Sequence, residues 1–182
     1  MKTPLQILGI LIATAVILLS MGRLPFCKCG VITLWSGNVW SNQNSQQFTD
    51  PYTFTHVLHG VGFYALTWIL ARRTPVQTRL VLAVILESSW EILENTDFII
   101  NRYRAATMSF DYYGDSILNS IGDILAMMGG FAIAMKTPAR MTAVGAILMD
   151  IALLVAIRDS LLLNIIMLIY PIESIRAWQM QP

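Results

Sequence analysis

The chain has 182 residues, of which 55% are hydrophobic and 13% are charged, and its formal net charge is +1. Average soluble domains contain about 25% charged residues, and the mean hydropathy here is +0.60, so the composition excludes an ordinary soluble domain. A net charge near zero also excludes the basic surface with which proteins bind nucleic acid. We therefore predict an all-α, polytopic transmembrane helix bundle that forms a single domain over residues 1–182.

The first predicted element is the apolar stretch 5–20, which follows Lys2. It is short for a transmembrane helix, which needs about 20 residues. Ser20 and Gly22 are small residues at the spacing that signal peptidase cleaves, so a cleaved signal peptide is the alternative to a first span. Under either interpretation, residues 23–51 form a polar loop outside the cytoplasm.

Four longer apolar runs follow, and we predict spans over 52–70, 80–100, 115–135 and 141–157. The last apolar segment, 161–170, would rise only about 15 Å as a helix. It is predicted to be a half-span or a re-entrant segment. The expected total is five full spans plus this short sixth segment, with the lipid bilayer as the partner.

Two connections contain basic residues and no acidic residue, namely 72–79 and 136–140. Alternating spans put both connections on the same side as Lys2. Because Lys and Arg concentrate in short cytoplasmic loops, we predict a cytoplasmic N-terminus. Residues 23–51 and 101–114 then face the outer side.

Polar side chains recur at helical spacing in three of the predicted spans, which places each set on one helix face. The sets are His56 and His59; Glu87, Glu91 and Glu94; and Asp115, Asn119 and Asp123. Carboxylates are costly inside a membrane and mark functional sites there. We predict a pocket open to the outer side whose candidate catalytic residues are His56, His59, Glu91, Glu94, Asp115 and Asp123.

Mixed imidazole and carboxylate groups suit a divalent metal ion such as Zn²⁺, Mn²⁺ or Fe²⁺. The candidate ligands are His56, His59, Glu91 and Asp123. Without a metal, a histidine and a carboxylate serve as a general acid–base pair.

Arginines of the outer loops are candidates for binding an anionic substrate group through forked hydrogen bonds. They are Arg102, Arg104 and Arg158, with Asn119 beside them. The alternative is structural: the same arginines fold inward and pair with the acids.

Two other features leave alternatives open. The acids, extended by Asp150, would also suit a proton- or cation-coupled transporter. Cys27 and Cys29 lie in the outer loop, where oxidising conditions favour disulfides, and the sequence leaves open whether they are bridged.

Several motifs together resemble a family of uncharacterised bacterial multi-pass inner-membrane proteins. They include Tyr52-Thr-Phe-Thr-His-Val-Leu-His-Gly60, Trp90-Glu-Ile-Leu-Glu-Asn95 and Asp111-Tyr-Tyr-Gly-Asp-Ser116. The resemblance implies a bacterial inner-membrane location and brings no known activity. A fainter resemblance, to VanZ-type membrane proteins, lies in the polar stripe of the span 115–135.

The leading expectation for function is a membrane-embedded enzyme or binding protein. It would act at the outer face on a lipid-linked or envelope substrate. The alternatives are the coupled transporter and an assembly or scaffold protein whose buried acids are only structural.

Overall fold

The computed structural model describes residues 2–109 and 111–180, and every regular element in those ranges is a helix. The all-α prediction is confirmed. In chain order the helices are α1 (Lys2–Ser20), α2 (Thr53–Ala71), α3 (Val76–Glu94), α4 (Asp97–Ala106), α5 (Ile117–Lys136), α6 (Ala139–Ile157), α7 (Leu161–Ile169) and α8 (Glu173–Gln179).

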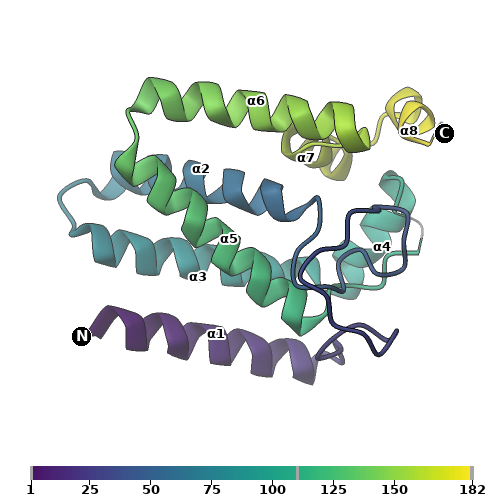
Figure 1. Ribbon diagram of the computed structural model, residues 1–182, viewed down its shortest axis with the longest axis horizontal. Helices are drawn as coiled ribbons and strands as arrows, with labels where there is room; N and C mark the ends of the chain where they lie inside the picture. The colour runs from purple at the N-terminus through teal and green to yellow at the C-terminus, as the bar shows by residue number, and fades with distance from the viewer. Residues whose placement is uncertain (1, 110, 181–182) are drawn as a thin grey trace.

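The five long helices run back and forth between two ends of the molecule (Figure 1). One end holds the N-terminus and the α2–α3 and α5–α6 connections. We call it the basic end, because it carries Lys2, Arg72, Arg73, Lys136 and Arg140. The opposite end holds residues 21–52 together with α4, α7 and α8, and we call it the loop end.

Glycines allow α2 and α5 to cross in backbone contact. A Cβ atom on Gly60 would lie 1.9 Å from the carbonyl oxygen of Met127, and one on Gly130 would lie 2.0 Å from that of Val57. Small residues at such positions let helices approach closely. The crossing fixes the face of α2 that carries the histidines against α5.

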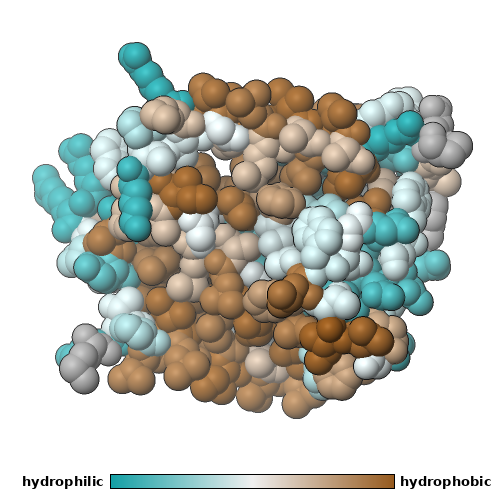
Figure 2. All heavy atoms as spheres, viewed as in Figure 1, coloured by the Kyte–Doolittle hydropathy of each residue, from teal (hydrophilic) through white to brown (hydrophobic). Residues whose placement is uncertain are grey.

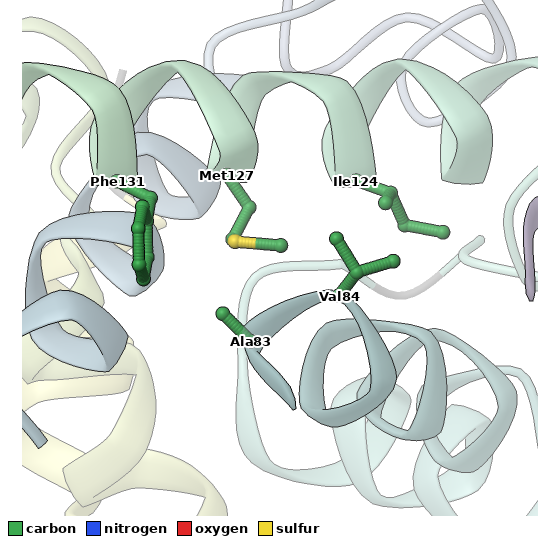
Figure 3. Packing of buried hydrophobic residues seen from close by; sticks show 5 residues of the cluster. All are labelled: Ala83, Val84, Ile124, Met127 and Phe131. Atoms are coloured by element: carbon green, nitrogen blue, oxygen red, sulfur yellow. The ribbon is translucent and has the colours of Figure 1, made fainter. Parts of the chain in front are cut away.

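An apolar core lies between α3 and α5 (Figure 3). Its α3 residues precede the glutamates of that helix and so lie nearer the basic end. The core consists of Ala83, Val84, Ile124, Met127 and Phe131, each at most 2% exposed. Burial of this much aliphatic and aromatic surface holds α3 and α5 together.

Four helices of the described chain are long and apolar enough to cross a membrane: α1, α2, α5 and α6. The outer faces of α1 and α6 expose rows of large hydrophobic side chains, and hydrophobic surface runs along both helices between the more hydrophilic ends (Figure 2). α3 has a similar length but contains Arg79 and three glutamates. The expected count of five full spans therefore exceeds the four helices that meet these criteria.

The helix predicted over 80–100 is two helices in the structure. α3 ends at Glu94, and α4 begins at Asp97 after Thr96, whose side chain accepts a hydrogen bond from the backbone N–H of Ile99. A threonine at this position caps a new helix start, so the chain turns instead of continuing. Arg79, placed by the sequence in a loop, lies within α3 and is buried.

The end of the chain also differs in detail. Residues 161–169 form a short helix at the loop end, and α8 follows it without having been predicted. Cys27 and Cys29 form a disulfide in the loop 21–52.

Candidate functional site

Two histidines from α2 share one glutamate from α3. The Nδ1 atom of His56 lies 2.5 Å from Oε1 of Glu87, and Nδ1 of His59 lies 3.1 Å from both of its carboxylate oxygens. Glu87 is fully buried and His56 is 7% exposed. A carboxylate that accepts these N–H groups fixes the orientation of both rings.

A second set of carboxylates surrounds the same imidazole, and three of its oxygens lack a hydrogen-bond partner. Oε1 of Glu91 is 3.4 Å from Nδ1 of His56, and Oδ2 of Asp123 is 3.7 Å from Nε2. Neither oxygen of Glu91 has a hydrogen-bond partner, nor does Oδ1 of Asp123. Glu91 is 1% exposed and Asp123 is 4% exposed. Buried polar atoms without partners are rare in folded proteins.

Charge is unbalanced at this point of the bundle. Within the described ranges, the ion pairs that reach Glu87, Glu91 and Asp123 all come from the two histidines. Two imidazoles supply at most two positive charges, and Glu94 and Asp115 add further carboxylates nearby. Full ionisation of all five acids would leave uncompensated charge in a buried site, which is costly.

Amide and hydroxyl groups hold the loop-end side of the site. Asn95 donates to Oδ2 of Asp115, and the hydroxyl of Tyr112 donates to the same oxygen at 2.9 Å. Asn119 donates to the carbonyl of Gln47, which ties the loop 21–52 to α5. The first turn of α5 and the end of α3 are thus joined through the site.

Two further carboxylates lie buried at the loop end and accept hydrogen bonds there. Asp50 accepts backbone hydrogen bonds from Ser45 and Tyr52, and its burial raises its pKa. Asp159 accepts from the backbone N–H of Ser160 and from the hydroxyl of Tyr52. Burial raises the pKa of Asp159 to about 6.

A cavity of about 700 Å³ opens above the acidic cluster at the loop end. Its polar side is formed by carboxylate, amide and aromatic groups, including Glu94, Gln46, Trp40 and Tyr112. Its apolar side is formed by α3 and α7. The lining residues Leu86, Leu93 and Ile165 are 42%, 46% and 45% exposed, so this side reaches the outer surface of the bundle.

The structure brings most of the sequence-predicted residues together. His56, His59, Glu94, Asp115, Asp123 and Asn119 line the cavity. Glu91 lies beneath it, beside His56. Two groups of these side chains have ligand atoms within 4.8 Å of one another: His56, His59 and Glu87; and His56, Glu91 and Glu94.

The outer-loop arginines are used elsewhere. Arg102 donates to the carbonyls of Leu168 and Ile169 at the end of α7. Arg104 donates to the carbonyl of Tyr112, and Arg158 contacts Trp178. None of the three lines the cavity. Cations near a helix C-terminus are favourable, which gives Arg102 a structural role.

Sequence reasoning left Glu87 out of the candidate site, although it begins the stripe that continues through Glu91 and Glu94. The i, i+4 relation to Glu91 was the signal that could have included it. Asn95, which joins Glu91 to Asp115, carried no comparable signal.

The fold and the site define an all-helical bundle with four helices apolar enough to span a membrane and a buried histidine–carboxylate cluster under an amphiphilic cavity. Residues 18–181 match the family described as "Protein of unknown function (DUF2585)", and the chain belongs to this family.

Its relatives are bacterial proteins of the uncharacterised UPF0314 group. The chain is 48% identical to a UPF0314 protein of Rhizobium etli, covering 94% of this chain and 88% of the relative. It is 49% identical to one of Rhizobium meliloti (96% and 89%) and 46% identical to one of Paracoccus denitrificans (93% and 88%). No solved structure matches the chain. The expected likeness to VanZ-type proteins finds no support among these relatives.

Proposed function

We propose that this protein is a multi-pass protein of the bacterial inner membrane that binds the head group of a lipid-linked or envelope substrate in its cavity. The hydrophobic surfaces of α1 and α6 support a bilayer location (Figure 2). The basic end would face the cytoplasm, since Lys and Arg concentrate there and acids do not. The cavity would then open to the outer side.

The observation that carries the proposal is the two-sided lining of the cavity. Carboxylate and amide groups face aliphatic residues of α3 and α7, and the aliphatic side reaches the bundle surface at Leu86, Leu93 and Ile165. Ligand pockets are mostly apolar with a few polar groups that orient the ligand. A lipid would place its chain along the aliphatic side and its head group against the polar side.

The head group is proposed to be uncharged and rich in hydroxyls, such as a sugar. The carboxylates would repel a phosphate, and the three outer arginines that could attract one are bonded to carbonyls or stacked elsewhere. Carboxylates accept hydrogen bonds from hydroxyls and amides both donate and accept them, while Trp40, Trp90 and Tyr112 offer aromatic faces. His59, oriented by Glu87, would be the acid–base group if the protein acts on the substrate chemically.

A transport role has less support. The apolar core of Ala83, Val84, Ile124, Met127 and Phe131 packs α3 against α5 (Figure 3). Along both helices these residues lie on the basic-end side of the acidic cluster. Asp150, which was expected to extend a cation route, lies beside the start of α7 and accepts from the backbone N–H of Leu162. Both features favour a pocket that is closed toward the basic end.

Lipid binding is tested by native mass spectrometry of the full chain in nanodiscs. The probes are a monoglucosyl diacylglycerol and phosphatidylglycerol with the same acyl chains. We expect selective retention of the glycolipid by the wild type and loss of that selectivity in Leu93→Trp, which fills the aliphatic side. Leu82→Trp is the matched control, since Leu82 is an exposed leucine of α3 that does not line the cavity. Equal retention of both lipids by the wild type would refute the proposal.

A further inference from the structure

The acidic cluster beneath the cavity has the composition of a metal site. His56, Glu91 and Glu94 offer one imidazole nitrogen and two carboxylate oxygens within 4.8 Å of one another. Mixed nitrogen and oxygen ligands suit Zn²⁺ and Mn²⁺ rather than Mg²⁺. Composition alone does not distinguish a metal site from a cluster of protonated acids.

The unpartnered carboxylate of Glu91 provides a second and independent observation. Both of its oxygens lack a hydrogen-bond partner although the residue is only 1% exposed. A protonated carboxyl would still be expected to donate its proton to a nearby acceptor. A carboxylate that faces an imidazole and another carboxylate at short range, without hydrogen bonds, is arranged as a ligand would be.

The ring of His56 is already oriented for coordination. When its Nδ1–H donates to Glu87, Nε2 is the nitrogen left to coordinate an ion, and it lies 3.7 Å from Oδ2 of Asp123. That separation is too long for a hydrogen bond. Two ligands of a tetrahedral ion, each about 2.0–2.2 Å from it, lie about 3.4 Å apart. Histidines that bind metals regularly donate their other ring nitrogen to a carboxylate.

We propose that His56, Glu91 and Glu94 bind one divalent transition-metal ion, Zn²⁺ or Mn²⁺, with Asp123 beside Nε2 of His56 as a further ligand and Glu87 as the residue that positions the ring. The two positive charges of one ion would offset two of the carboxylates, which reduces the charge imbalance of the cluster. Glu94 and Asp123 line the cavity, so an ion held there would face a bound head group. The role of the ion toward a substrate rests on the proposed function.

Metal binding is measured without any lipid substrate, so it can fail or succeed independently of lipid binding. The full chain in nanodiscs is stripped with a chelator, loaded with Zn²⁺, Mn²⁺ or Mg²⁺, desalted and analysed by inductively coupled plasma mass spectrometry. We expect retention of one Zn²⁺ or Mn²⁺ per chain and no retention of Mg²⁺. If the wild type retains neither Zn²⁺ nor Mn²⁺, the metal site is refuted, whatever the result with glycolipid.

Variants locate the ion. Glu91→Gln is expected to abolish stoichiometric retention, and Glu87→Gln to weaken affinity about 10–100-fold, as the loss of a group that orients a ligand does. Asp159→Asn is the matched control, a buried carboxylate of the loop end outside the cluster, and it should retain the ion. Retention by Glu91→Gln equal to that of the wild type would contradict the proposed ligands.

Electron spin-echo measurements on the Mn²⁺-loaded protein test the histidine directly. A ¹⁴N coupling is expected in the wild type, lost in His56→Gln and preserved in His59→Gln. Coupling that survives in His56→Gln but disappears in His59→Gln would assign the ion to the other cluster and overturn the inference.

Thermal unfolding of each variant in chelator shows whether it is folded without metal. Because Glu91 loses no hydrogen bond on substitution, Glu91→Gln is expected to be as stable as the stripped wild type.

Discussion

Glu87 is a fully buried residue that accepts hydrogen bonds from two imidazoles of another helix. A buried donor left without its partner costs about 1–3 kcal/mol. Glu87→Ala removes the partner of both His56 and His59, so we predict a loss of about 2–5 kcal/mol in the free energy of unfolding. Denaturant unfolding in a fixed detergent measures it. Ser89→Ala is the control, because Ser89 is exposed and bonds only to its own helix. Equal stability of the two variants would contradict the assigned role of Glu87.

The buried carboxyl group of Asp159 makes the stability of the folded protein depend on pH. Burial raises its pKa from the ordinary value of 3.8 to about 6. A raised pKa in the folded state means that folding favours the protonated acid, so this contribution to stability is present below pH 3.8 and is lost as pH rises through 6. Asp159→Asn should therefore be more stable than the wild type at pH 7, with the difference shrinking toward pH 4. Apparent melting temperatures across this range measure it, and a constant difference would refute the prediction.

The crossing of α2 and α5 is the element-scale feature on which the site depends, because it places His56 next to Asp123. Gly60→Ala adds a Cβ 1.9 Å from a backbone carbonyl, which cannot move without separating the helices. We predict destabilisation of about 3 kcal/mol or more. Gly62→Ala meets nothing within 4 Å and should be neutral or slightly stabilising. The two variants are compared by thermal unfolding, and similar melting temperatures would argue against the close crossing.

The same elements show what the sequence could and could not predict. Hydropathy located α2, α5 and α6 within a few residues, because long apolar runs are strong signals. It failed at 80–100, where the apolar residues 98–100 looked like a continuation of the span. There the capping bond of Thr96 and the amide of Asn95, which bonds to both Glu91 and Asp115, end one helix and start another. The bond from Asn95 to Asp115 joins separate segments, whereas the other two are local and were signalled only by the polarity of Asn95-Thr-Asp97.

The clustering of the polar side chains was predictable for a different reason. Spacings of three and four residues place His56 with His59 and Glu91 with Glu87 on single helix faces before any fold is known. Which helices pack against each other depends on the tertiary fold. The hydrogen-bond partners of the arginines could therefore not be predicted from the sequence. Arg102 was expected to meet an anion and instead meets the last carbonyls of α7. Nothing in the sequence separates these two uses of a guanidinium group.

At the scale of the whole molecule, the basic end and the loop end differ in charge and in chemistry. Lys2, Arg72, Arg73, Lys136 and Arg140 belong to the basic end, while the disulfide of Cys27 and Cys29 and the cavity belong to the loop end. A disulfide persists in an oxidising compartment, and basic loops remain in the cytoplasm. Both arguments support the proposed orientation, in which the loop end lies outside.

Labelling of single cysteines tests this orientation in intact cells. In a Cys27→Ser, Cys29→Ser background, Gln77→Cys lies at the basic end and Asn101→Cys at the loop end, and both replace exposed amides. In spheroplasts whose inner membrane is intact, a membrane-impermeant maleimide should label Asn101→Cys. It should reach Gln77→Cys only after that membrane is permeabilised. The opposite labelling pattern would show that the loop end faces the cytoplasm. The cavity with its acidic cluster would then open to the cytoplasm. Labelling of both sites before permeabilisation would contradict a bundle whose helices α2, α5 and α6 separate the two ends by a bilayer.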